Sequence, residues 1–301
     1  MATGKPPAQY PFSPKSITVG GGHHLSCLVE GDGRAVVFVH GNPSWSYLYR
    51  NVITGLKGSC RCIAPDHLGC GLSDKPQDYP YRLRNHIDNL EEVLDKLGVE
   101  KCILVMHDWG GAIGMGWATR HPDKVDGMVV MNTAAFRSRR IPFRIAVCRW
   151  PGLGPFLVRG LNGFARASVH MAVAETMSPD IAAGFLKPYD SWENRIAVLR
   201  FVQDIPLREG HPSWNDLVDI ESKLELLALK PMLLCWGGKD FCFNEHFFNE
   251  WQQRFPEAEA RYFSDAGHYL LEDSFDSIFP LISHFVHSCS SGDRKSNETR
   301  P

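Results

Sequence analysis

The stretch CILVMHDWGGAIG, residues 102–114, constrains the possible folds of this chain more than any other. A short apolar run ends at a single acid, which is followed by a Trp, two glycines and a second apolar run. This pattern predicts a buried strand, a tight turn and a helix that packs under a sheet. Asp108 stands at the tip of that turn, so its carboxylate needs a chemical explanation.

Short apolar runs bounded by turn residues predict eight strands. They are Ser16–Val19, Leu25–Val29, Ala35–Val39, Cys62–Ala64, Cys102–Met106, Met128–Met131, Met232–Trp236 and Arg261–Phe263. The central runs are continuously apolar, which is typical of parallel strands covered on both faces. Helical patterns lie between the strands, as at Arg84–Leu97 and Gly110–Arg120. The alternation predicts an α/β fold with a mostly parallel eight-stranded sheet.

The alternation of strands and helices stops between residues 137 and 229. This stretch holds aromatic residues, arginines, prolines and helical pieces such as Trp192–Val202, without a clear strand. We therefore expect a core domain at 10–136 and 230–287, with a helical cap at 137–229 inserted after the sixth strand. Such an insertion lies over the carboxyl edge of the sheet, where ligands bind. The polar residues 288–301 are predicted to form a disordered tail.

Composition excludes several classes of protein. The formal net charge of −2 argues against nucleic-acid binding, which needs a strong basic excess. A local basic run at Arg137, Arg139, Arg140 and Arg144 is interpreted as a solvated patch beside a loop. No apolar stretch is long enough for a signal peptide or a membrane span. The nine scattered cysteines suit buried thiols in a reducing compartment, so we expect a cytoplasmic protein.

Three stretches are predicted to meet at the carboxyl edge of the sheet. VVFVHGNPSW places Asn42 after one strand, and HDWGG places Asp108 and Trp109 at the turn. The third consists of MLLCWGGKD, which ends at Asp240, and FSDAGHY, which contains His268. The chain order of nucleophile, acid and histidine is that of an α/β-hydrolase triad, with an Asp where a Ser is usual.

The motifs HGNPSW, HDWGG, WGGKD and DAGHY, with DHLGCGLSDKP at 66–76, resemble the haloalkane dehalogenase group of the α/β-hydrolases. The resemblance runs from about residue 10 to residue 287. It implies hydrolysis of a carbon–halide bond, with a small apolar substrate and a halide ion as ligands. The Trp and Asn that hold the halide in that family match Trp109 and Asn42. Some members carry the triad acid where this chain has Asn132, which leaves Asp240 as the acid.

The chemistry of these side chains fits that resemblance. A carboxylate such as Asp108 can displace a leaving group from a saturated carbon and form an alkyl ester. His268 is then the candidate base for hydrolysis of the ester, and Asp240 orients His268. The indole of Trp109 and the amide of Asn42 donate to the halide, and their backbone N–H groups are expected to form the oxyanion hole. No cofactor is needed, and no clustered ligands predict a metal site.

Structural alternatives remain for each of these residues. Asp108 or Asp240 could cap a helix, and His268 could be a buried structural histidine. Asn42 could be an ordinary turn residue before proline, and Trp109 could serve packing alone.

Other activities also fit the pattern. Some members of this branch resemble the β-lactone decarboxylases of bacterial olefin biosynthesis, in which Asp108 would attack the lactone and loss of CO2 would give an alkene. The stretch Arg140–Leu207, with FVQDIPL near its end, is similar to that group. An epoxide hydrolase is a third alternative, weakened because the cap holds one tyrosine, Tyr189, where two are usual. The intact triad argues against a binding protein without turnover.

Overall fold

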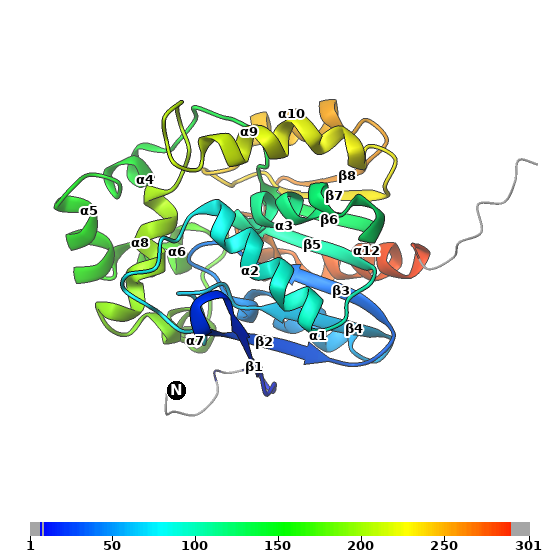
Figure 1. Cartoon of the computed structure of the whole chain (residues 1–301), viewed down its shortest axis with the longest axis horizontal. Coiled ribbons are helices and arrows are strands. Elements are labelled where there is room, and N and C mark those ends of the chain that lie inside the picture. Colours follow the sequence, from blue (N-terminus) through cyan, green and yellow to red (C-terminus); the bar gives the residue numbers. More distant parts are fainter. Residues whose placement is uncertain (1–6, 8, 290–301) are drawn as a thin grey trace, which may run out of the picture.

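The computed structural model describes residue 7 and residues 9–289 (Figure 1). Eight strands form one sheet in the order β1-β2-β4-β3-β5-β6-β7-β8. They are β1 (Lys15–Val19), β2 (His23–Glu30), β3 (Arg34–Val39), β4 (Cys60–Pro65), β5 (Cys102–Asp108), β6 (Val125–Thr133), β7 (Met232–Gly237) and β8 (Glu259–Phe263). Strand β2 runs antiparallel to β1 and β4, and the other pairs are parallel. The predicted strands all lie within observed ones, which confirms the mostly parallel eight-stranded sheet.

Helices cover both faces of the sheet. The core helices are α1 (Arg50–Leu56), α2 (Leu83–Lys96), α3 (Trp109–Arg120), α10 (Glu245–Arg254), α11 (Leu270–Asp273) and α12 (Phe275–Ser288), with short 3-10 turns η1 (Gly20–Gly22), η2 (Ser46–Tyr49) and η3 (Pro122–Lys124). Successive residues of β5 point to opposite faces. Leu104 belongs to the apolar cluster of α2 and α3, and Val105 belongs to that of α1 and α12. Burial on both faces explains why β5 reads as a continuous apolar run.

The chain between β6 and β7 forms a cap of helices without a strand, as predicted. Its elements are α4 (Phe143–Val147), α5 (Leu153–Pro155), η4 (Phe156–Gly160), α6 (Gly163–Met171), α7 (Pro179–Leu186), η5 (Lys187–Tyr189), η6 (Glu193–Arg195), α8 (Ile196–Gln203), α9 (Trp214–Lys223) and η7 (Leu224–Leu227). Helices α4 to α8 gather at one end of the sheet, on the left of Figure 1. Helix α9 instead packs on α3, and its Leu217 and Ile220 join the apolar cluster of the core.

Two further findings concern the ends and the helices of the chain. Ser288, the first residue of the predicted disordered tail, is the last residue of α12. The predicted tail from residue 290 onwards lies outside the described residues. None of the described helices is both long enough and apolar enough to cross a membrane.

Candidate active site

Asp108 lies where β5 turns sharply into α3. Its backbone has φ 53° and ψ −127°, a region that L-residues rarely adopt. Two glycines allow this close turn, because a Cβ on Gly110 would overlap the carbonyl oxygen of Val39, and one on Gly111 would overlap the side chain of Thr133. The Thr133 hydroxyl also donates to the carbonyl oxygen of Asp108 and so ties the turn to the end of β6. This anchored turn presents the Asp108 side chain to the cavity described below.

The Asp108 carboxylate is buried and receives backbone N–H groups. Its Oδ1 accepts from the Asn42 N–H at 2.6 Å, and the Trp109 N–H also donates to the carboxylate. These are the two N–H groups expected to form an oxyanion hole. Burial raises the pKa of Asp108 above its ordinary value of 3.8, although His268 and the two N–H groups act in the opposite direction. The side chain makes no capping hydrogen bond to α3, so a helix-capping role has no support.

His268 lies between two carboxylates. Its Nε2 is 3.8 Å from Oδ2 of Asp108, and its Nδ1 is 2.7 Å from Oδ2 of Asp240. Burial alone would lower the pKa of His268, but the charge and hydrogen bond of Asp240, together with Asp108, raise it above its ordinary value of 6.5. The structure therefore brings the three predicted triad residues together in the order Asp108, His268, Asp240, with one acid at each nitrogen of the imidazole.

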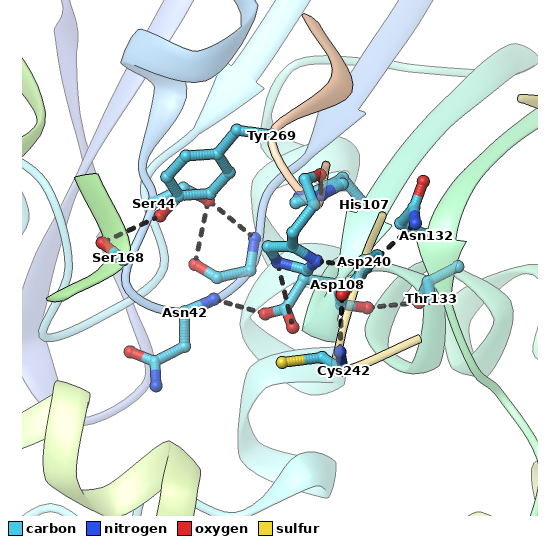
Figure 2. A network of polar contacts seen from close by, with 12 residues as sticks. Asn42, Ser44, His107, Asp108, Asn132, Thr133, Ser168, Asp240, Cys242 and Tyr269 are labelled. Carbon is cyan, nitrogen blue, oxygen red and sulfur yellow. Dashed lines mark hydrogen bonds and ion pairs between the residues drawn. The ribbon is translucent and has the colours of Figure 1, made fainter. Parts of the chain in front are cut away.

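Asp240 is held by donors from the end of β6 and from its own loop. Its Oδ2 accepts from Nδ2 of Asn132 at 2.9 Å, and its Oδ1 accepts from the Cys242 N–H at 2.6 Å (Figure 2). Asn132, at the end of β6, is itself fixed because its Oδ1 accepts from the Gly237 N–H at 2.7 Å. Burial opposes ionisation of Asp240, but His268 and the backbone N–H groups of Cys242 and Phe243 lower its pKa below the ordinary value of 3.8.

A helix-capping role for Asp240 also lacks support. Helix α10 begins at Glu245, and Asn244 caps it through the N–H of His246. The carboxylate of Asp240 instead turns back toward His268 and the end of β6. Its partners are those expected of a residue that orients the imidazole.

The two predicted leaving-group donors are placed differently. Trp109 lines the cavity with its ring centroid 5.3 Å from that of Phe201, and its indole N–H makes no hydrogen bond within the described part of the chain. The Asn42 amide points away from Asp108 (Figure 2). Its Nδ2 donates to the Val198 carbonyl of α8 at 3.2 Å. A primary amide carries two N–H bonds, so one remains for a ligand. Asn42 thus contributes its backbone N–H directly, whereas its side chain is held by the cap.

His107 is not among the site residues predicted from the sequence, yet it contacts His268. Its Nε2–H donates to the backbone carbonyl of His268 at 2.8 Å. Burial lowers the pKa of His107 to about 3, so the ring is neutral and can keep this role. Its place beside Asp108 in HDWGG was the available signal, but nothing in the sequence shows that the side chain reaches the loop after β8.

A cavity of about 400 Å³ lies between the sheet edge and the cap. Asn42, Asp108, Trp109 and His268 line its base. The cap lines most of the remainder with apolar side chains, among them Ile141, Ile145, Leu157, Phe164, Val202 and Ile205. A volume of this size is typical of small-molecule sites, roughly 300–1,000 Å³. Among the described residues, no three His, Cys, Asp or Glu side chains are placed to hold a metal ion.

Comparisons with known proteins agree with this geometry. Residues 34–275 match the alpha/beta hydrolase fold family. A cis-3-alkyl-4-alkyloxetan-2-one decarboxylase of Shewanella oneidensis is 46% identical over 272 residues, covering 88% of this chain and 86% of that protein. A haloalkane dehalogenase of Mycolicibacterium smegmatis is 32% identical, covering 98% of each. The solved haloalkane dehalogenase DbeA of Bradyrhizobium elkani gives a TM-score of 0.83 at 26% identity, covering 94% of this chain and 100% of its own. The chain therefore belongs to the alpha/beta hydrolase fold family.

Proposed function

We propose that this protein is a β-lactone decarboxylase, which converts a cis-3-alkyl-4-alkyloxetan-2-one into an alkene and carbon dioxide. The observation that carries the proposal is the 46% identity to a protein of that name, against 32% to the dehalogenase. The cavity adds support, because most of its cap lining is apolar and suits two alkyl substituents, while Asn42, Asp108, Trp109 and His268 supply polar groups at its base. The sequence motifs predicted haloalkane dehalogenase first and β-lactone decarboxylase as the alternative, and this proposal places the decarboxylase first.

The reaction needs only the Asp108 carboxylate and the substrate. A carboxylate oxygen attacks the saturated ring carbon that bears the ring oxygen, and that carbon–oxygen bond breaks. The product of this step is an ester of Asp108 whose alkyl group carries the released substrate carboxylate. The bond between that carboxylate and its neighbouring carbon then breaks and supplies the electron pair of the alkene. The ester carbon–oxygen bond breaks in the same step, which frees Asp108 without consuming water.

The other residues of the site stabilise charge and orientation during these steps. Backbone N–H groups of Asn42 and Trp109 already contact the Asp108 carboxylate and would hold the ester carbonyl oxygen. The indole of Trp109 and the remaining amide N–H of Asn42 would donate to the carboxylate released from the ring. His268, held by Asp240, supplies positive charge near both carboxylates, as its raised pKa favours.

Haloalkane dehalogenase is the second candidate, and it is favoured by the Trp109 indole beside Asp108, whose N–H has no hydrogen-bond partner among the described residues and could hold a halide. In that reaction Asp108 forms the same kind of ester, but water activated by His268 hydrolyses it. Epoxide hydrolysis has less support. Tyr189, the single tyrosine of the cap, is buried and donates to the carbonyl of Ser44 at 3.3 Å instead of lining the cavity.

Single turnover in oxygen-18 water separates the two candidates. With enzyme in excess over a cis-dialkyl β-lactone, we expect alkene release and no mass change in the peptide that contains Asp108. Hydrolysis of an ester would instead place oxygen-18 in the Asp108 carboxylate. Parallel reactions with 1-bromobutane report bromide release and the same peptide mass.

The variant His268→Phe gives a second way to distinguish the two reactions. If elimination needs no base, this variant still releases alkene from the lactone, more slowly, and leaves no lasting adduct. A dehalogenase would instead accumulate the alkyl ester on Asp108 with 1-bromobutane. Oxygen-18 in Asp108 after lactone turnover, or the absence of alkene from the wild-type protein, contradicts the proposed function.

A further inference from the structure

One segment of the cap, residues 137–174, has a strongly basic composition. It contains no Asp or Glu, although the whole chain has a net charge of −2. Its seven arginines are Arg137, Arg139, Arg140, Arg144, Arg149, Arg159 and Arg166. Within the described part of the chain, Arg137 alone among them forms an ion pair, with Glu221 at 2.5 Å. The other six form no ion pair within the described residues, although Asp204 lies near Arg149 and Glu193 near Arg159, so most of the positive charge of this segment is not paired with an acid.

The same segment exposes large apolar side chains. Phe143 is 74% exposed, Phe156 56%, and Trp150 and Leu161 51% each. They belong to or adjoin α4, α5 and η4, and Figure 1 places α4 and α5 at the outer edge of the cap. Folded proteins usually scatter exposed apolar residues, so apolar residues gathered on one segment mark a surface that makes contacts. We call this surface of residues 137–174 the basic apolar face.

The basic apolar face adjoins the mouth of the cavity. Arg140, Arg144 and Met171 line the cavity and are also exposed, so the cavity reaches the surface through this segment. Phe143 precedes Arg144 in α4. The Arg144 guanidinium carbon lies 6.0 Å from the ring centroid of Phe241, another exposed residue of the cavity wall. A molecule that enters the cavity here passes between the arginines and apolar side chains of this face.

We propose that the basic apolar face docks the protein onto an anionic lipid bilayer, with the cavity mouth turned toward the lipid. Trp and Phe side chains are favoured at the level of the headgroups, and arginines are attracted to anionic lipids. A substrate that fits the apolar cavity partitions into lipid in preference to water. Docking at the mouth gives such a substrate a path that avoids water. Anionic headgroups match the arginines, the interfacial level of the bilayer matches the exposed Phe and Trp side chains, and the apolar substrate is itself concentrated in lipid, so lipid is the partner that accounts for all three features.

Co-sedimentation with lipid vesicles tests this proposal, whatever reaction the site performs. We expect the full chain to sediment with vesicles of phosphatidylcholine and phosphatidylglycerol, and far less with phosphatidylcholine alone. Raised salt should weaken binding, because it screens exposed charges. The triple variant Phe143→Ser, Trp150→Ser, Phe156→Ser should lower vesicle affinity by more than about tenfold.

The charge of the face is tested separately with Arg139→Gln combined with Arg166→Gln. Removing both positive charges should lower affinity for the anionic vesicles by about 10- to 30-fold. Neither arginine lines the cavity, and both are exposed, so the fold should remain intact by circular dichroism and thermal unfolding.

Leu229→Ser is the matched control, because Leu229 is 88% exposed and lies outside the basic apolar face. It should bind vesicles as the wild-type protein does. The proposal is overturned if the wild-type chain does not sediment with the anionic vesicles, or if the triple variant binds as tightly as wild type. Loss of self-association or of a protein partner in the triple variant, without a change in vesicle binding, would also overturn it.

Discussion

The ends of β5 and β7 each present a buried carboxylate to His268, but they surround it differently. After β7, Asp240 accepts hydrogen bonds from the Asn132 amide, the Cys242 N–H and His268, and its pKa is lowered. At the end of β5, Asp108 remains 3.8 Å from His268, and burial raises its pKa. A carboxylate whose lone pairs are engaged can orient a neighbour, whereas one that faces a cavity can attack a substrate. The same side chain thus serves two roles because its hydrogen-bond partners differ.

Removing the reactive member of the pair should have the largest effect. The variant Asp108→Gly should lose activity by at least about 10⁴-fold, because no nucleophile remains. Glycine adopts φ 53° without strain, so the turn from β5 to α3 should survive the change. Product release under single-turnover conditions measures the loss, and thermal unfolding checks the fold. Activity close to that of wild type would exclude Asp108 as the nucleophile.

Removing the orienting member should have a smaller effect. In Asp240→Asn the amide cannot balance an imidazolium and would place N–H groups against the Asn132 donor. By analogy with other triads, we expect kcat to fall by about 10³- to 10⁴-fold. Asp265→Asn is the matched control, because it makes the same chemical change at a side chain that is 91% exposed and that pairs with Lys239 instead of His268. Equal losses in the two variants would contradict the assigned role of Asp240.

The smallest expected effect is on the stability of the fold. The contributions of Asp108 and Asp240 to the free energy of unfolding should change with pH in opposite directions. The folded-state pKa of Asp240 lies below 3.8, so its carboxylate stabilises the fold above pH 3.8, and this contribution disappears as pH falls through the lowered pKa. The folded-state pKa of Asp108 lies above 3.8, so stability is lost as pH rises from 3.8 through the raised pKa.

Urea unfolding across this acidic range measures the difference. Relative to wild type, Asp108→Asn should become more stable as pH rises, and Asp240→Asn less stable, so the two differences in free energy of unfolding should have opposite slopes against pH. His268 adds a third contribution, because its raised pKa stabilises the fold below pH 6.5 and this stabilisation is lost as pH rises through that pKa. If stability changed with pH in the same way in both Asn variants, the two acids would have equivalent surroundings, which would contradict this prediction.

The strands and the helices α2 and α3 could be predicted because their signals are local. Continuous apolar runs identify strands buried on both faces, and Gly110 and Gly111 beside Asp108 identify a close turn. The hydrogen bonds that distinguish the acids could not be predicted in this way. Asn132 reaches Asp240 across 108 positions of the chain, and Asn42 reaches Val198 across 156. Such partners are chosen by how the strands and the cap meet.

The sequence by itself determined the fold class, the place of the cap and the set of residues at the edge of the sheet, because periodicity, turn residues and chain order are properties of short stretches. Only the tertiary structure decided the surroundings of each group. It holds the Asn42 amide against the cap, leaves the Trp109 indole without a partner in the described chain, and places the exposed Arg140 and Arg144 on the cavity wall. Burial and hydrogen bonding between distant segments set charge and reactivity, and no local pattern encodes them.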